Sequence, residues 1–158
     1  MGGKMKKLLY TLIQVFWGFP QTFVGLIIFI ITNKCPHKYF YGSICTRWKL
    51  KASLSLGLFI FVSDDPFYYY ESQKSNYTYD EFFSMLSVHE YGHTIQSLIW
   101  GPLYLLMVGA PSMIWAKIPF FARRRLNENK SYFDIYPEKQ ANRLGEKVTG
   151  LNSPGSML

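Results

Sequence analysis

The stretch SVHEYGHTIQS, residues 87–97, contains two histidines four positions apart, His89 and His93, with Glu90 directly after the first. On an α-helix, side chains four residues apart project from the same face, so both imidazoles can reach one metal ion. Glu90 lies about 100° further round the helix, where it can contact a water molecule on that metal but is poorly placed to be a ligand. The stretch therefore predicts a helix that carries part of a metal site with a carboxylate beside it.

The H-E-x-x-H pattern is typical of zinc metallopeptidases, in which two histidines bind zinc and the glutamate is the general base. The alternative is a metal-free helix whose histidines are buried and hydrogen-bonded. The rest of this helix is largely apolar, and placing two histidines and a glutamate there is costly unless a metal ion compensates. We therefore predict Zn²⁺ as the cofactor, with His89 and His93 as metal ligands and Glu90 as catalytic base. Thr94 and Gln96 follow, and either line the same cavity or bond to the backbone.

Start and stop signals bound this helix. Thr78 is a good N-cap, and Glu81 three residues later completes a capping box. Gly101-Pro102 follows the last helical residue and would stop or kink the helix. The sequence therefore predicts a zinc helix over residues 79–100.

Catalytic zinc normally has three protein ligands and one open position, so a third ligand is needed. Ile99 stands where the metzincin pattern would have a third histidine. The downstream candidates are Glu128, Glu138 and Glu146. Glu138 lies in YPEKQANRLG, within a predicted helix over residues 137–150 whose first turn suits Pro137.

Together, HEYGHT and EKQANRLG resemble the gluzincin clan of metallopeptidases, and most of all its integral-membrane branch of CAAX prenyl proteases and HtpX-type proteases. The resemblance covers only these two short motifs. It implies a zincin-like core with a small antiparallel sheet, an HExxH helix and a third-ligand helix. It also implies that Glu138 is the third metal ligand. Asn142 stands where the family has an aspartate that orients a ligand histidine, and an amide supplies no negative charge there, so ligand basicity should be lower.

Residues 38–63 are rich in aromatic and β-branched residues and are expected to form β-strands. In SLSLGLFIF (Ser53–Phe61), alternation predicts that Leu54, Leu56, Leu58 and Ile60 share one face of a strand. The resemblance to gluzincins implies that this strand is an exposed edge on which a substrate peptide adds as a further strand. A simple core strand is the alternative.

The oxyanion that forms during peptide hydrolysis needs a hydrogen-bond donor. Tyr132, Tyr136, His37 and Arg143 are candidates. Arg143 and Tyr136 adjoin the third-ligand motif, so we predict that these two are the catalytic donors.

Two long segments, residues 8–33 and 94–116, contain no charged side chain. Each is as long as the roughly 18–20 residues that a helix needs to cross a hydrocarbon core. Each also contains a helix breaker, WGFPQ (Trp17–Gln21) and VGAPS (Val108–Ser112). We expect membrane elements at 8–33 and 101–118, either as kinked spans or as re-entrant hairpins.

The net charge is +7, and the basic residues border the apolar segments. They are Lys4, Lys6 and Lys7, then Lys34 and Lys38, then Lys117 and Arg123–Arg125. This placement favours anionic lipid headgroups over nucleic acid as the partner. We expect a protein of the cytoplasmic membrane with its active site toward the cytoplasm. Cys35 and Cys45 lack metal-binding spacing, and either pair or are buried thiols.

The sequence thus predicts one α+β membrane domain over residues 1–158. The predicted function is a membrane-embedded zinc metallopeptidase that cleaves peptides or membrane-proximal protein segments. Two alternatives remain: an inactive metal-binding membrane scaffold or chaperone, and a small membrane interaction protein without metal.

Overall fold

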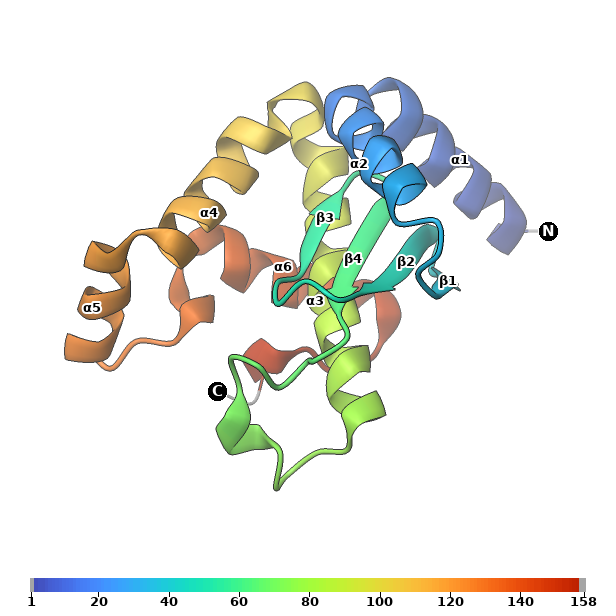
Figure 1. The fold of residues 1–158 in the computed structure, drawn as a ribbon. Coiled ribbons are helices and arrows are strands. Elements are labelled where there is room, and N and C mark those ends of the chain that lie inside the picture. Colours follow the sequence, from blue (N-terminus) through green and yellow to red (C-terminus); the bar gives the residue numbers. More distant parts are fainter. Residues whose placement is uncertain (1, 157–158) are drawn as a thin grey trace.

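The protein has an α+β fold, seen in a computed structural model that describes residues 2–156, with their side chains from residue 5 to residue 155. The described residues form six α-helices and one four-stranded sheet (Figure 1). In chain order the elements are α1 (Gly2–Phe16), α2 (Phe19–Ile31), β1 (His37–Phe40), β2 (Ser43–Trp48), β3 (Leu54–Leu56), β4 (Phe59–Ser63), α3 (Tyr79–Trp100), α4 (Ala110–Lys117), α5 (Pro119–Asn127) and α6 (Tyr136–Thr149).

The sheet is mixed, with the strand order β1-β2-β4-β3. The outer pairs β1–β2 and β3–β4 are antiparallel, but the central pair β2–β4 is parallel. The expectation of a purely antiparallel sheet was therefore wrong at its centre. The physical reason is the connection over residues 49–53, which carries the chain past the place of β4 to the sheet edge, so that β4 returns in the direction of β2.

The stretch Ser53–Phe61 is a hairpin rather than one strand. Gly57 has a φ of +61°, and the loop at Gly57–Leu58 reverses the chain between β3 and β4. Because Ser55 pairs with Ile60 across the hairpin, these two residues share one face, and Leu54 and Leu56 lie on the other. The prediction that four alternate residues share one face was therefore wrong, since a two-residue loop inverts the alternation.

Both faces of the sheet are covered by helices. On one face, α3 packs against Ile60 and Val62 in the larger hydrophobic core. On the other face, α2 contributes Ile28 and Phe29, which pack with Phe59, Phe61 and Trp48. Cys45 belongs to the first core and Cys35 to the second; both thiols are free.

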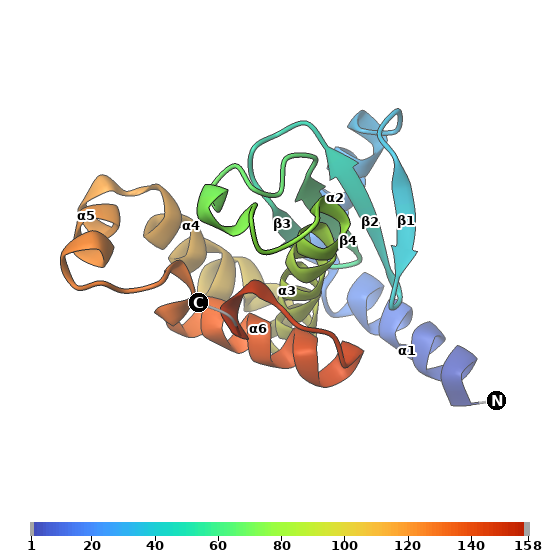
Figure 2. The ribbon, with the colours of Figure 1, turned by 90° about the horizontal axis from the view of Figure 1, so that it is seen from below.

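The helix α3 runs from Tyr79 to Trp100 with the predicted capping box at its start. The Thr78 hydroxyl accepts from the backbone N–H of Glu81, and the Glu81 carboxylate accepts from the backbone N–H of Thr78 at 2.8 Å. Figure 2 shows α3 between the sheet and α6. This helix is therefore the central element that fixes the other layers.

The close crossing of α3 and α6 depends on glycine. A Cβ at Gly92 would lie 1.8 Å from the carbonyl oxygen of Ala141, and a Cβ at Gly145 would lie 2.2 Å from that of Val88. Any larger residue at either position would push the two helices apart. These two glycines, of which Gly92 directly precedes His93, thus set how near α6 comes to the predicted metal site.

Between residues 2 and 156, no single helix is both long and apolar enough to cross a membrane, whereas two sharply bent helix pairs reach the required length and composition together. The first pair bends by 96° between Phe16 and Phe19, at the predicted breaker. The second pair bends by 119° between Leu103 and Leu105, ahead of the predicted breaker at Val108–Ser112. Pro111 does not break a helix there, because the π-helical stretch Leu105–Gly109 runs directly into α4 and Pro111 lies in the first turn of α4.

Candidate metal centre

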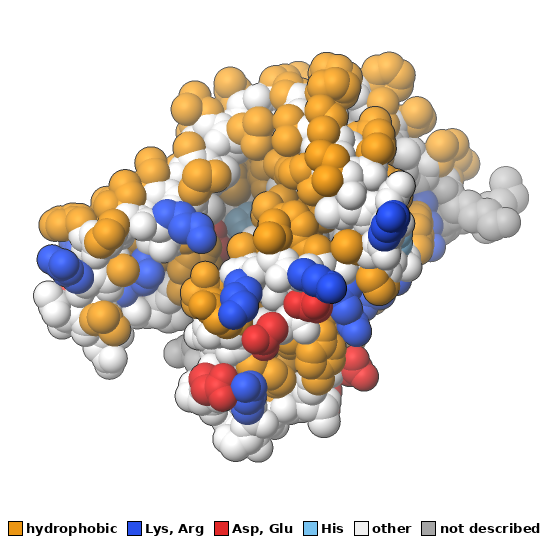
Figure 3. Space-filling model, viewed as in Figure 1, with side chains coloured by type: hydrophobic (Ala, Val, Ile, Leu, Met, Phe, Trp, Pro, Cys, Tyr) orange, Lys and Arg blue, Asp and Glu red, His pale blue; other side chains and the backbone are white. Residues whose placement is uncertain are grey.

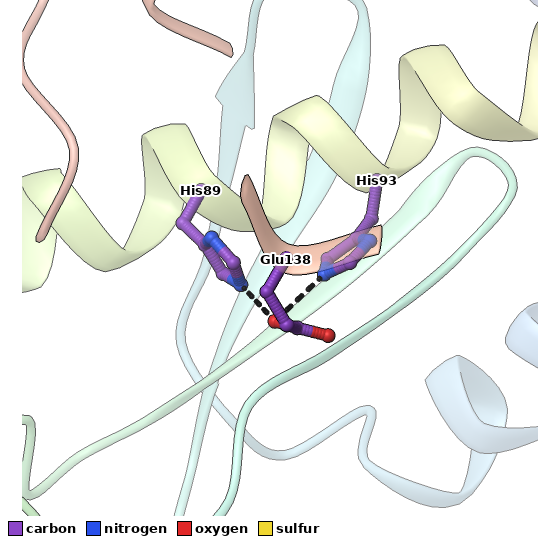
Figure 4. Close-up of side chains that lie close together, drawn as sticks. All are labelled: His89, His93 and Glu138. Carbon is purple, nitrogen blue, oxygen red and sulfur yellow. Dashed lines mark ion pairs between the residues drawn. The ribbon is translucent and has the colours of Figure 1, made fainter. Parts of the chain in front are cut away.

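Two histidines of α3 and one glutamate of α6 come together as the sequence predicted. Oε2 of Glu138 lies 3.1 Å from Nε2 of His89 and 3.5 Å from Nε2 of His93. The three ligand atoms all lie within 4.8 Å of one another. Figure 4 shows both imidazole rings descending from α3 toward the same carboxylate oxygen. The group can therefore hold one metal ion.

The chemistry of this group fits zinc. Tetrahedral zinc with ligands at about 2.1 Å places its ligand atoms about 3.4 Å apart, close to the two distances measured between Glu138 and the histidines. Glu138 is 0% exposed, yet neither of its carboxylate oxygens receives a hydrogen bond of normal geometry. A buried carboxylate without hydrogen bonds is costly unless a cation compensates. Two imidazoles and one carboxylate form a usual ligand set for catalytic zinc.

Glu138 owes its place to the start of α6. It lies in the first turn of the helix, after Pro137, where the helix dipole favours a negative charge. Burial raises the pKa of Glu138, but the imidazoles of His93 and His89 outweigh burial and hold this pKa well below its ordinary value. Glu138 is therefore available as a carboxylate ligand at neutral pH.

Each histidine is held by the amide of a neighbouring side chain. Nδ1 of His89 lies 2.7 Å from Oδ1 of Asn142, and Nδ1 of His93 lies 2.7 Å from Oε1 of Gln96. An amide oxygen only accepts, so each Nδ1 carries a proton and each Nε2 is the ring atom left to bind a metal, which would displace any proton from it. Gln96 also donates to the carbonyl oxygen of Pro137 at 2.8 Å, which ties the histidine to the start of α6.

Asn142 thus occupies the orienting position that the resemblance implied, and Gln96 performs the same role for the second histidine. Of the two polar residues that follow His93, Gln96 belongs to the site, whereas the hydroxyl of Thr94 donates to the backbone carbonyl of Tyr91 at 2.7 Å. The aromatic ring of Phe133 packs edge-on against His89 at 5.2 Å and further restricts the imidazole.

Glu90 is buried on the side of α3 that faces the sheet. The hydroxyl of Ser55, on the edge strand β3, lies 2.7 Å from Oε2 of Glu90 and 2.6 Å from its backbone oxygen. The hydroxyl of Tyr104 donates in turn to the carbonyl oxygen of Ser55 at 3.2 Å. Sequence reasoning missed both contacts, because β3 and the bend after α3 are distant in the chain and neither carries a motif.

The two predicted oxyanion donors lie toward the surface. The side chain of Tyr136 is 49% exposed. Arg143 is exposed and borders a pocket of about 280 Å³, together with Asn142 and Glu146. His37, on β1, contacts Thr46 at 2.9 Å, across the sheet from α6.

Two other tyrosines are closer to the carboxylates. Burial, and then the charges of Glu138 and Glu90, raise the pKa of Tyr132 and also the pKa of Tyr70. Both hydroxyls therefore stay protonated and can donate. Tyr132 was among the four sequence candidates, whereas Tyr70 lies in a tyrosine-rich loop without periodicity that could have pointed to it.

Solvent reaches this region from one side. In Figure 3, histidine atoms are visible at the floor of a hollow between the body of the protein and the arm formed by α4 and α5.

Comparisons with models of known protein families, with curated proteins and with solved structures found no match to this chain.

Proposed function

We propose that the protein is a membrane-associated zinc metallopeptidase that hydrolyses peptide bonds in peptides or in membrane-proximal protein segments. The observation that supports this most directly is the buried group of His89, His93 and Glu138, whose carboxylate lacks hydrogen bonds of normal geometry. Retention of a buried carboxylate at Glu90 favours a catalyst over a purely structural metal site, because a structural site has no use for a base.

When bound, zinc would polarise the scissile carbonyl and lower the pKa of a water molecule. Glu90 is the residue that would accept the proton of the attacking water and return it to the nitrogen of the leaving amine, so one proton would move and no oxidant would be needed. Ser55 holds the Glu90 carboxylate in place by its hydroxyl group. Asn142 and Gln96 keep both imidazoles in the tautomer that binds metal. A hydroxyl donor toward the carbonyl oxygen would come from Tyr132 or Tyr70, which rank above Tyr136 and Arg143 by burial.

The edge strand β3 is suited to hold an extended peptide beside the metal group. It lies at the end of the sheet order, and its residue Ser55 contacts Glu90. A substrate strand would gain main-chain hydrogen bonds there. The carbonyl oxygen of Ser55 already accepts from Tyr104, so that the docking strand must either bond to the remaining groups or displace this hydroxyl.

The decisive experiment compares the purified wild type with Glu90→Gln, in the presence of zinc and a broad library of fluorogenic peptides. We expect both proteins to bind one zinc ion, and only the wild type to cleave peptides. Glu71→Gln is the matched control, since Glu71 is an exposed glutamate that pairs with Lys74.

The alternatives give different results. If the wild type binds zinc but cleaves no peptide, the protein is a metal-binding scaffold. If the wild type binds no zinc and His89→Ala changes nothing, the protein is a metal-free interaction module and the hydrolase proposal fails.

The membrane part of the proposal has its own support. Large apolar side chains are exposed over α1, α2 and the segment from Ile99 to Phe120. Phe16 is 78% exposed, Ile31 75% and Leu106 67%. Surfaces of this kind on a single chain mark a contact with lipid or with another protein. The basic residues that border them favour lipid.

A further inference from the structure

The apolar surface gathers around the two helix bends. In Figure 3, hydrophobic side chains cover the upper part of the visible face, over α1, α2 and α4, while charged side chains gather below them. The two bends also contact each other: the indole N–H of Trp17 donates to the carbonyl oxygen of Leu98 at 3.1 Å, and a Cβ at Gly101 would lie 2.1 Å from the Trp17 ring. The bend between Phe16 and Phe19 and the bend between Leu103 and Leu105 therefore lie together in one apolar surface, which we call the apex.

Two glutamines inside this apex donate hydrogen bonds within the protein, whereas the Gln21 carbonyl oxygen and the indole N–H of Trp100 have no partner among the described residues. Gln14 donates to the carbonyl oxygen of Thr94 at 2.8 Å, and Gln21 donates to Ser97 at 2.7 Å and to the carbonyl oxygen of Gly101 at 3.0 Å. Irregular backbone is tolerated at membrane depth only where the protein itself satisfies it. The glutamines do this at the bend of the second pair.

Three of the four arms of the bent pairs, all except Tyr79–Leu103, are too short to cross a bilayer. Residues Met5–Phe16 and Phe19–Ile31 form helices of about 18 and 20 Å, against a hydrocarbon core of about 30 Å. The part of α3 that packs between the sheet and α6 cannot enter the hydrocarbon either. Helix α6 exposes the charged side chains of Lys139, Arg143 and Lys147, which would have to enter with it.

The basic side chains lie where both bent pairs leave the apolar surface. Lys6 and Lys7 lie in the first turn of the first pair, and Lys34 and Lys38 follow that pair. Lys117 ends the second pair, and Arg123 and Arg124 follow it; all of these side chains are exposed. If both pairs return to the side from which they entered, all three groups lie on one side. Two simple spans would place one of the three basic groups on the opposite side of the membrane from the other two. Two pairs that return to their own side avoid this.

We propose that the protein inserts into a single leaflet of an anionic membrane without crossing it, with the two bends as its deepest point. This inference rests on the membrane part of the proposed function and is independent of peptidase activity. The metal site, both flanks of each bent pair and the sheet then share one aqueous side, and the substrates are those presented at that surface.

The test is one-sided labelling of full-length protein added to preformed vesicles, with about one third anionic phosphatidylglycerol in phosphatidylcholine. Single cysteines are introduced as Lys7→Cys, Lys34→Cys and Arg124→Cys on a background in which Cys35 and Cys45 are alanine, with Phe16→Cys and Leu106→Cys as apex positions. The probe is a membrane-impermeant maleimide, and Lys147→Cys on α6 is the control for the aqueous side.

We expect the three flank positions and the control to be labelled to the same extent before and after vesicle lysis. The apex positions should be labelled in detergent-free buffer without vesicles and protected with vesicles. If a cysteine at one of the three flank positions reacts only after lysis, the chain crosses the membrane. That result overturns insertion into a single leaflet but not membrane association. Full labelling of the apex positions, with no flotation of the protein with vesicles, removes membrane association itself.

The dependence of membrane binding on anionic lipid is measured with the same vesicles. We expect partitioning to fall about fivefold for each flanking charge removed, as in Lys117→Gln, and to fall further in vesicles of phosphatidylcholine alone. Equal partitioning into neutral and anionic vesicles would overturn the assignment of the basic residues to lipid headgroups.

Discussion

Replacing Asn142 tests how much the amides behind the histidines contribute to metal binding. In Asn142→Ala, Nδ1 of His89 loses the oxygen 2.7 Å away. The two side chains are 6% and 4% exposed, so water cannot readily take the place of the amide. Loss of an outer hydrogen-bond partner of a ligand histidine costs about 10- to 100-fold in metal affinity, or about 1.4 to 2.7 kcal/mol.

The substitution Asn142→Asp should act in the opposite direction on zinc. A carboxylate of the same shape keeps the acceptor and adds a negative charge, which makes His89 a stronger ligand. Without metal, however, the same charge lies one helical turn from the buried carboxylate of Glu138, and like charges repel. We therefore expect tighter zinc binding together with a lower unfolding temperature for the metal-free protein.

The assay is a zinc competition titration against a chromophoric chelator at about pH 7.5, accompanied by thermal unfolding with and without zinc. Lys147→Gln, exposed on the same helix, is the control for changes to α6 itself. If Asn142→Ala binds zinc within about twofold of the wild type while its fold is intact, Asn142 does not orient His89 and the reasoning fails.

Three further predictions follow from contacts around the site. Gly92→Ala places a Cβ against the carbonyl oxygen of Ala141. We expect the free energy of unfolding, measured with denaturant, to fall by about 1–3 kcal/mol, and zinc affinity, measured by titration, to fall as well. If both quantities stay unchanged, α3 and α6 do not cross as closely as described. Gln21→Leu leaves the carbonyl oxygen of Gly101 without its donor and should cost about 1–3 kcal/mol by the same unfolding assay, whereas an unchanged midpoint would show that water replaces the amide. Bound zinc, measured by equilibrium dialysis between about pH 8 and pH 4, should fall as pH falls, because protons compete with zinc for the ligand atoms. Burial lowers the pKa of His93, but the charge of Glu138 outweighs burial and raises this pKa to about 9 without metal, so the competition begins above neutral pH. Because the pKa of Glu138 is held low in the folded protein, its carboxylate contributes fully to stability above the unfolded pKa of about 4.3 and loses this contribution only as pH falls through the lowered value; zinc binding that does not change over this pH range would contradict the ligand assignment.

Local signals in the sequence predicted the helix of the site well. The capping box at Thr78 and Glu81 set the start of α3, and Gly101-Pro102 set its end, because both act through hydrogen bonds of neighbouring residues. The spacing of His89 and His93 is likewise a property of one helix. Glu138 was found only because its short motif resembles a known one, and the structure then brought it to the histidines.

Non-local features could not be predicted. The hairpin at Gly57 keeps an alternating pattern on both sides of its loop, so that periodicity alone could not separate one strand from two. The second bend begins at Gly101, whose φ of +51° ends α3, so the Gly101-Pro102 signal marked it, whereas no residue type marks the π-helical stretch Leu105–Gly109 that follows. Ser55 and Tyr70 reach the site through tertiary packing, which a single sequence does not encode in any short pattern.

The bend after α3 is joined to the carboxylate of Glu90 by two successive hydrogen bonds. The hydroxyl of Tyr104 holds the backbone of Ser55, and the hydroxyl of Ser55 holds Glu90. Tyr104 lies directly between the two arms of the bent pair. If the protein inserts into lipid as proposed, a movement at Tyr104 would be transmitted through these two hydrogen bonds to β3 and to Glu90, and the depth of insertion would then change the position of the Glu90 carboxylate.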